Sequence, residues 1–412
     1  MREALQHREF RLLFAGQAVS AIGDQIFPVA VTVQVLDHGG SVGQLGLVLA
    51  ARFASLVLFA LVGGVWADRL PRVRLLISAD VLRLVAVLGL AVVMTDTTPV
   101  VVLAPLVFLV GAGEAFFRPA QGALMPSVLP PEHLAQGNAL AGSTFHFASI
   151  IGPGLAGLLV VGVGARGAML VDAATFAVSL ATLLRMREPE RVRAARQPML
   201  TEIGEGIAAV RARPWIGAVL LMAMVQLLLL VPACSVLLPA LFRAAGNTGA
   251  YGYVLAVGAA GGLLGSLLAG HLRPHRRGLV GMLCLLAFAA EPLALLADAD
   301  PWVLGGAWFL ASSGLGPFLV YWETSLQQDV PAALLARVIS LDWMCSFALL
   351  PLGLAIVGPV IDAVGREPVL WVALGAAVVP PLACLPVRGI FHFRTPATDR
   401  LLTGASQVPQ PG

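Results

Sequence analysis

The chain has 412 residues, of which 58% are apolar and 12% are charged, with a formal net charge of +3 and a mean hydropathy of +0.88. Soluble domains carry about 25% charged residues, so this composition excludes a water-soluble fold of this size, as well as disordered and collagen-like chains. The small net charge gives no basic surface for nucleic acid, and the four cysteines lack the paired spacing of a disulfide scaffold or metal site. The composition therefore predicts an all-α polytopic membrane protein.

Twelve runs of the sequence are long and apolar enough to cross a bilayer, which requires roughly 20 mostly apolar residues per helix. In chain order they cover approximately residues 10–36, 44–67, 75–95, 100–124, 137–162, 167–186, 214–242, 250–271, 278–298, 302–323, 337–361 and 367–386. We therefore expect twelve transmembrane helices.

The arginines predict how these helices are oriented, because positive charge gathers in cytoplasmic loops. All 26 cations are arginine. Three lie inside spans (Arg52, Arg83 and Arg118), and three lie in loops of one side (Arg166, Arg243 and Arg366), which leaves twenty on the other side. The imbalance predicts a multi-pass protein of the inner or plasma membrane with both termini in the cytoplasm.

A polar linker at residues 187–213 divides the spans into two sets of six. We expect an N-terminal half at 1–186, a C-terminal half at 214–390 and a cytoplasmic tail at 391–412. Within the linker, residues 200–210 carry apolar residues at helical spacing and are expected to form an amphipathic helix on the membrane surface. The halves resemble each other weakly: Pro131 and Leu134 before span five match Pro331 and Leu334 before span eleven. Two pseudo-symmetric six-helix halves are an architecture of transporters.

The loop after span two carries the sharpest motif, which consists of Gly64, Asp68, Arg69, Arg72 and Arg74. An acid at the end of a helix, followed by cations, can form an ion-pair network that breaks when two halves move apart. The pattern resembles the cytoplasmic signature of the major facilitator superfamily. In that family the loop implies a gating latch between the halves, and the expected latch partners here are Arg83, Arg118 and Arg337.

Two further stretches extend this resemblance. Span five contains Gly152, Pro153 and Gly157, which are similar to the superfamily's Gly-Pro element associated with exporters. Ordinary packing of small residues is the alternative interpretation of these positions. The segments 114–126 and 321–343 resemble the enterobactin-exporter and macrolide-efflux branch of the family.

Ionisable residues inside the spans are functional candidates, because charge is costly in hydrocarbon. Asp24, Glu114 and Asp342 are candidate proton carriers. The alternative role of Asp24 is a structural hydrogen bond. Glu114 shares a helix face with Arg118, so the two can neutralise one another in a structural group that Arg83 could join. Asp342 can instead act with Arg337 as the second half's counterpart of the latch partners. Arg52 and His146 are candidates for lining a central cavity. Asp172 and Glu291 are weaker candidates, which we expect to lie near the outer interface.

Together these observations predict a secondary transporter that exports a small hydrophobic or amphipathic compound, such as a drug, secondary metabolite or siderophore, by alternating access. The proton gradient is the expected energy source, with no cofactor and no metal, because the chain has no phosphate-binding loop. We expect a monomer in the lipid bilayer without nucleic-acid partners. An importer driven by protons is the main alternative. An integral membrane enzyme is a weaker one, because no catalytic cluster is evident, and a channel is disfavoured by the absence of filter residues.

Overall fold

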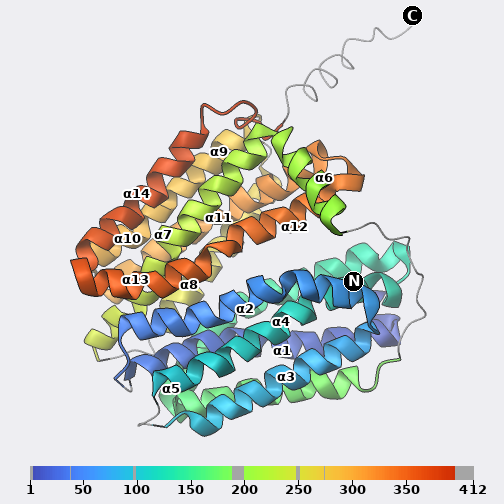
Figure 1. Cartoon of the computed structure of the whole chain (residues 1–412), viewed down its shortest axis with the longest axis horizontal. Coiled ribbons are helices and arrows are strands. Elements are labelled where there is room, and N and C mark those ends of the chain that lie inside the picture. Colours follow the sequence, from blue (N-terminus) through green and yellow to red (C-terminus); the bar gives the residue numbers. More distant parts are fainter. Residues whose placement is uncertain are drawn as a thin grey trace, which may run out of the picture. The chain divides into compact units, whose positions relative to one another are not determined.

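The structure is a computed structural model that describes residues 3–37, 39–95, 99–187, 199–246, 251–272 and 274–394. All regular elements of these ranges are helical (Figure 1). They are η1 (Ala4–Gln6), α1 (Arg8–Asp37), α2 (Val42–Arg69), α3 (Arg72–Val93), α4 (Val100–Val128), α5 (Pro131–Leu183), α6 (Met199–Arg211), α7 (Pro214–Ala244), α8 (Tyr251–His271), α9 (Arg277–Leu285), η3 (Leu286–Ala289), α10 (Ala290–Leu296), α11 (Pro301–Asp329), α12 (Ala332–Ala348), α13 (Leu350–Val364) and α14 (Arg366–Cys384).

Eleven helical segments in the described ranges are long and apolar enough to cross a membrane. One of them belongs to α5, whose 53 residues would extend about 80 Å if straight, far more than one bilayer requires. Gly164 interrupts α5 with φ 74° and ψ 170°, a backbone conformation that glycine adopts without a steric penalty. α5 therefore consists of two arms that supply spans five and six, and the prediction of an all-α protein with twelve transmembrane helices is confirmed.

The helices pack into two compact units. The first unit contains residues 1–193, 235–259 and 350–366, and the second contains 194–234, 260–349 and 367–412. The first unit thus combines α1 to α5 with the end of α7, the beginning of α8 and α13.

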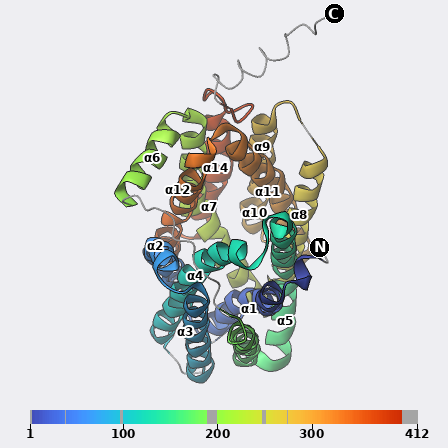
Figure 2. The same ribbon diagram turned by 90° about the vertical axis from the view of Figure 1, so that its right-hand side faces the viewer.

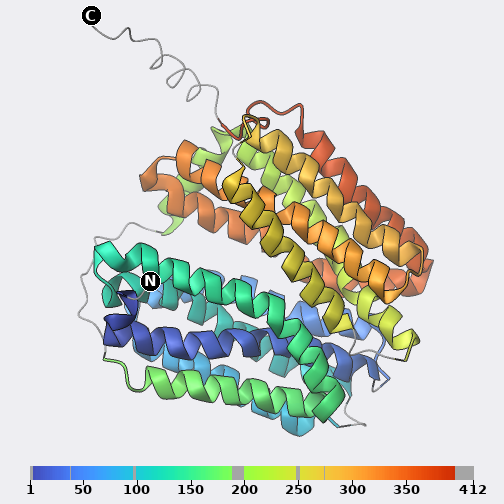
Figure 3. The same ribbon diagram turned by 180° about the vertical axis from the view of Figure 1, so that it is seen from behind.

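In the first unit, α1 lies between the two arms of α5, as Figure 3 shows from behind. α4 packs against both α2 and α3, and α3 also contacts α5. Figure 2 views α1 nearly end-on, with α3 and α5 on either side of it. This arrangement directs one face of each helix α1 to α5 towards a common interior.

Glycines allow α13 to approach α2 within the first unit. A side chain at Gly358 would overlap the backbone of Gly43, and one at Gly46 would overlap the carbonyl of Leu354. Close backbone approach at small residues is the usual way in which membrane helices pack. The glycines at these positions therefore fix the distance between the two helices.

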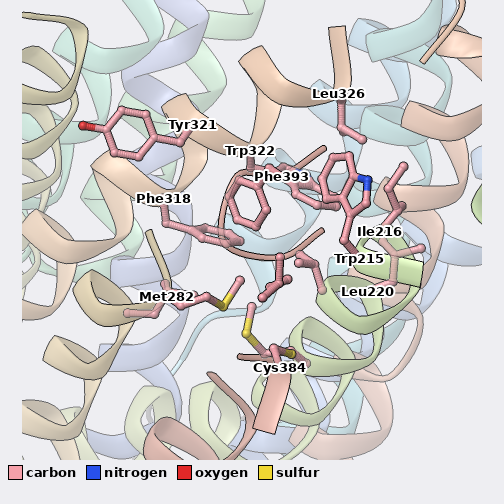
Figure 4. Close-up of a cluster of buried hydrophobic side chains, with 14 of the residues drawn as sticks. Trp215, Ile216, Leu220, Met282, Phe318, Tyr321, Trp322, Leu326, Cys384 and Phe393 are labelled. Atoms are coloured by element: carbon pink, nitrogen blue, oxygen red, sulfur yellow. The ribbon is translucent and has the colours of Figure 1, made fainter. Parts of the chain in front are cut away.

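The second unit is centred on an aromatic cluster, shown in Figure 4. The ring of Trp215 on α7 lies 5.4 Å from the rings of both Trp322 on α11 and Phe393 near the end of the described chain. The indole Nε1 of Trp215 donates to Oδ2 of Asp329 at 3.3 Å, so its polar atom is satisfied inside the cluster. Phe393 thereby ties the segment after α14 to α7 and α11.

The helix predicted at residues 200–210 is present as α6, and it packs on α12. Glu205 forms an ion pair with Arg337 of α12, and Gly206 faces Leu341 and Arg337. The linker helix is therefore attached to span eleven within the second unit.

The contact between Gly43 and Gly358 can be tested with a matched pair of glycine substitutions. Gly358→Ala should lower the thermal midpoint of the purified protein, because overpacking a close contact costs about 1–3 kcal/mol. Gly375→Ala on α14 is the control, since a Cβ at that position meets no atom within 4 Å. Thermal unfolding in detergent, followed by tryptophan fluorescence, measures both. Equal midpoints for the two variants would contradict the close approach of α2 and α13.

Candidate functional site

The transmembrane part of the first unit contains a cluster of ionisable side chains contributed by all five helices α1 to α5. Its members are Asp24 on α1, Arg52 on α2, Asp80 and Arg83 on α3, Glu114 and Arg118 on α4, and Asp172 on α5. Charged groups in hydrocarbon are costly unless they are paired. The pairing within this cluster therefore determines what it can do.

Arg83 is the centre of the first group of ion pairs. Its Nη2 donates to Oδ1 of Asp80 at 2.5 Å, and its Nη1 donates to Oδ1 of Asp24 at 3.3 Å. The two acids therefore share one guanidinium. Asp80 is the better satisfied of the two, because Ser179 on α5 also donates a hydrogen bond to its Oδ2 at 2.6 Å.

Two phenylalanines hold the Arg83 guanidinium in place. Its central carbon lies 4.5 Å from the ring centroids of both Phe117 on α4 and Phe176 on α5. A guanidinium stacked on aromatic faces gains cation–π attraction, which is strongest where water is excluded. The side chain of Arg83 is 3% exposed, so its head group is fixed by contacts from four helices.

Glu114 is the centre of the second group. Its Oε2 accepts from Arg52 at 3.0 Å and 3.3 Å, and its Oε1 accepts from Arg118 at 2.6 Å and 3.0 Å. Each oxygen thus receives two hydrogen bonds from one guanidinium. Phe27 on α1 lies 5.3 Å from the guanidinium carbon of Arg52. This group is positively charged, because two arginines surround one carboxylate.

Asp172 on the second arm of α5 is completely buried. A side chain at Gly23 of α1, next to Asp24, would overlap Oδ1 of Asp172 and the hydroxyl of Thr175. Glu291, on α10, is buried as well and hydrogen-bonds with the thiol of Cys234. Both acids are therefore enclosed within their units, and their position near the outer interface stays a prediction.

Six of the seven members of the cluster were expected from the sequence as ionisable residues inside spans, and the structure pairs Glu114 with Arg118, as expected. The roles of the others were assigned differently. Arg83 and Arg118 were expected as latch partners, and the structure pairs them with acids of α1, α3 and α4. Asp80 was missed. Its spacing of three residues before Arg83 on one helix face was the signal that could have identified it.

The predicted loop motif is described only in part. Gly64, Asp68 and Arg69 belong to the last part of α2, but the side chains of Asp68 and Arg69 lie outside the described residues. Arg72 donates to the hydroxyl of Ser127 at 2.7 Å, and Arg74 is exposed.

The exporter-type motif of span five lies where α5 meets α1 and α8. A Cβ at Gly152 would overlap the side chain of Gln25 on α1. A Cβ at Gly252 of α8 would lie 2.5 Å from the carbonyl oxygen of Pro153 and 3.4 Å from Gly157. The motif therefore brings three helices together at short distance.

The remaining candidates are separate from this cluster. Arg337 pairs with Glu205, and Asp342 accepts a hydrogen bond from Nε1 of Trp322 at 3.2 Å. The side chain of His146 lies outside the described residues. Among the described residues, no group of three or more His, Cys, Asp or Glu side chains could hold a metal ion.

Comparison with known proteins places this architecture in a family. The sequence profile of the Major Facilitator Superfamily matches residues 13–354. The multidrug efflux pump Tap of Mycolicibacterium fortuitum is 28% identical over 406 residues, which cover 94% of this chain and 96% of that protein. The enterobactin exporter EntS of Shigella boydii serotype 18 is 28% identical over 342 residues, covering 81% of this chain and 80% of that protein.

The solved structure of the nucleoside transporter NupG has the same fold, with a TM-score of 0.72 at 13% identity. The match covers 91% of this chain and 99% of that one. With most of its length matched by the family profile, the chain belongs to the Major Facilitator Superfamily and is a multi-pass membrane transporter of small molecules, not an enzyme.

Proposed function

We propose that the protein exports small hydrophobic or amphipathic compounds across the cell membrane, driven by protons that move inward. The observation that carries the proposal is the buried cluster, in which Asp24 and Asp80 share the guanidinium of Arg83. Protonation of one acid releases Arg83 to the other, so the cluster can exist in two arrangements. The names of the two relatives, a multidrug efflux pump and an enterobactin exporter, support export and this class of compound.

Coupling requires that the proton and the transported compound bind differently to the inward-facing and outward-facing states. Asp24 is suited to exchange protons because its side chain is 38% exposed, whereas that of Arg83 is almost fully buried. Glu114 is suited to a fixed role, since two arginines hold it ionised. In this proposal Asp24 and Arg83 belong to the moving part of the cluster, and Glu114, Arg52 and Arg118 form its stable part.

With both termini in the cytoplasm, as the arginines predict, four helix ends lie at the outer side. They are the beginning of α2, the end of α7, the beginning of α8 and the end of α13. Arg243 on α7 donates to the carbonyl of Gly40 at 2.7 Å, and Tyr251 on α8 hydrogen-bonds with Thr32 on α1. The packing of Gly358 on Gly43 lies at the same side. These contacts join the outer ends of α1, α2, α7, α8 and α13 within the first unit, and we propose that the transporter is a monomer.

Export can be tested in everted membrane vesicles energised by respiration, with ethidium, tetraphenylphosphonium, a macrolide and a catecholate siderophore as probes. Wild type should dissipate the pH gradient with at least one probe, because a compound pumped into the vesicle lumen exchanges for protons. Vesicles without the protein are the blank, and Asp300→Asn in an exposed loop is the matched control. Dissipation by none of the probes, together with proton-driven uptake of a probe into whole cells, would establish an importer instead.

The stable part of the cluster predicts a double-mutant result. Glu114→Gln should lower the free energy of unfolding by about 3 kcal/mol, because it leaves Arg52 buried without its carboxylate. The double variant Arg52→Gln with Glu114→Gln should be more stable than Glu114→Gln alone, since it removes both charges together and Arg118 is half exposed.

Thermal unfolding in detergent measures this comparison, and Glu323→Gln, on an exposed position of α11, is the control. If the losses of unfolding free energy caused by the two single substitutions instead add up in the double variant, the Arg52–Glu114 pair does not stabilise the first unit.

A further inference from the structure

Asp172 differs from the other acids of the cluster in its surroundings. Its side chain is 0% exposed. One oxygen, Oδ1, is 3.5 Å from the hydroxyl of Thr175, and the other, Oδ2, has no hydrogen-bond partner in the described part of the chain. The groups nearest to the Asp172 carboxyl group offer it few hydrogen bonds. Gly23 contributes no side chain, and the Thr175 hydroxyl already donates to the backbone carbonyl of Asp172 at 2.7 Å.

The charges that face Asp172 come from three neighbouring helices. They are Asp24 on α1, Arg52 on α2 and Arg83 on α3. Neither arginine forms a salt bridge with Asp172, because every salt bridge of Arg52 and Arg83 among the described residues is made to Asp24, Asp80 or Glu114. Asp24, in contrast, is a like charge beside it.

The charges of the cluster also leave Asp172 without a cationic partner. Four carboxylates (Asp24, Asp80, Glu114 and Asp172) face three guanidiniums (Arg52, Arg83 and Arg118). The three arginines are engaged by the first three acids, which leaves one negative charge in excess. An unpaired carboxylate in the protein interior costs far more free energy than a neutral carboxylic acid that leaves one oxygen without a hydrogen bond. One proton on Asp172 neutralises the cluster at the lowest cost.

We propose that Asp172 is the residue that binds the coupling proton in this conformation, which rests on the proposed function. Loss of that proton by way of the neighbouring Asp24, whose side chain is 38% exposed, yields a carboxylate at Asp172 that competes with Asp24 and Asp80 for Arg83. Movement of Arg83 towards Asp172 would then separate it from Asp24 and change the contact between α1 and α3. The proton on Asp172 therefore selects which helices Arg83 connects.

A row of polar side chains on α5 supports this site. Asp172, Thr175, Ser179 and Thr182 recur every three or four residues, which places them on one face of the helix. Glycines of α1 allow this face to approach closely, since side chains at Gly16 and Gly23 would overlap the hydroxyls of Thr182 and Thr175. Hydroxyls both donate and accept hydrogen bonds, so this seam can adapt to either protonation state of Asp172.

Infrared difference spectra of the full chain in proteoliposomes, recorded between acidic and alkaline buffers, test the assignment without any transported compound. Wild type should show the carbonyl stretch of a protonated carboxylic acid that is lost at alkaline pH. Glu291 is also buried and would give a band of its own, so the variants are compared in protein that carries Glu291→Gln. In that background Asp172→Asn should lack the band, whereas Asp24→Asn should keep it at the acidic end of the titration, and Asp300→Asn should leave it unchanged. If Asp172→Asn fails to fold, Asp172→Glu should keep the band at a shifted frequency.

Three results would overturn the proposal: a band that persists in Asp172→Asn, a band that Asp24→Asn removes at every pH, or no titrating band in wild type. The vesicle experiment with ethidium separates this proposal from the proposed function. If ethidium dissipates the gradient with wild type and Asp300→Asn but not with Asp172→Asn, the result supports both the proposed function and the role of Asp172. Failure of wild type with every probe overturns the proposed function, while the infrared band still reports whether Asp172 binds a proton.

Discussion

The first unit depends on one guanidinium that serves two carboxylates inside the membrane. Arg83 lies between Phe117 and Phe176 and reaches Asp80 on its own helix and Asp24 on α1. Removing water makes each of these interactions stronger and each missing partner more costly. The helices α1, α3, α4 and α5 must therefore be arranged so that all of these groups meet at one point, which constrains their packing more than apolar contacts alone would.

This constraint explains why the charges of the cluster come in sets. Glu114 receives four hydrogen bonds from Arg52 and Arg118, so both guanidiniums within the spans have a carboxylate partner. A group held on both oxygens has little freedom to exchange partners. A group that shares its partner, as Asp24 does, can exchange it at lower cost. The cluster thus combines a rigid part and an adaptable part within one set of five helices.

The sequence could predict which residues are unusual and that Glu114 can meet Arg118 on the same helix, but not which residues of different helices meet. Asp24, Arg52, Arg83 and Glu114 were recognisable because each is an ion inside an apolar run, and the twelve helices followed from hydropathy and length alone. Pairings between helices, such as that of Arg52 with Glu114, depend on helix rotation, which one sequence leaves open. Burial of Asp172 depends on Gly23 of another helix, which hydropathy alone does not reveal. The loop motif was informative through its resemblance to a family, although the side chains of Asp68 and Arg69 lie outside the described residues.

The same segment of α1 connects the charges to the packing at the predicted outer side. Gly23 faces Asp172 on the second arm of α5, and Gln25, two residues later, faces Gly152 on the first arm. One residue beyond Gly152, the carbonyl of Pro153 contacts Gly252 at the beginning of α8. Because close-packed backbones have no space in which to absorb a displacement, movement of α8 away from Pro153 changes the support of α1 next to Asp24. Conversely, a change of partner at Arg83 alters the position of Asp24 and thus the surface that α5 presents to α8. The proton that we propose and the packing at the outer end of the first unit would therefore act on the same three residues of α1, Gly23, Asp24 and Gln25.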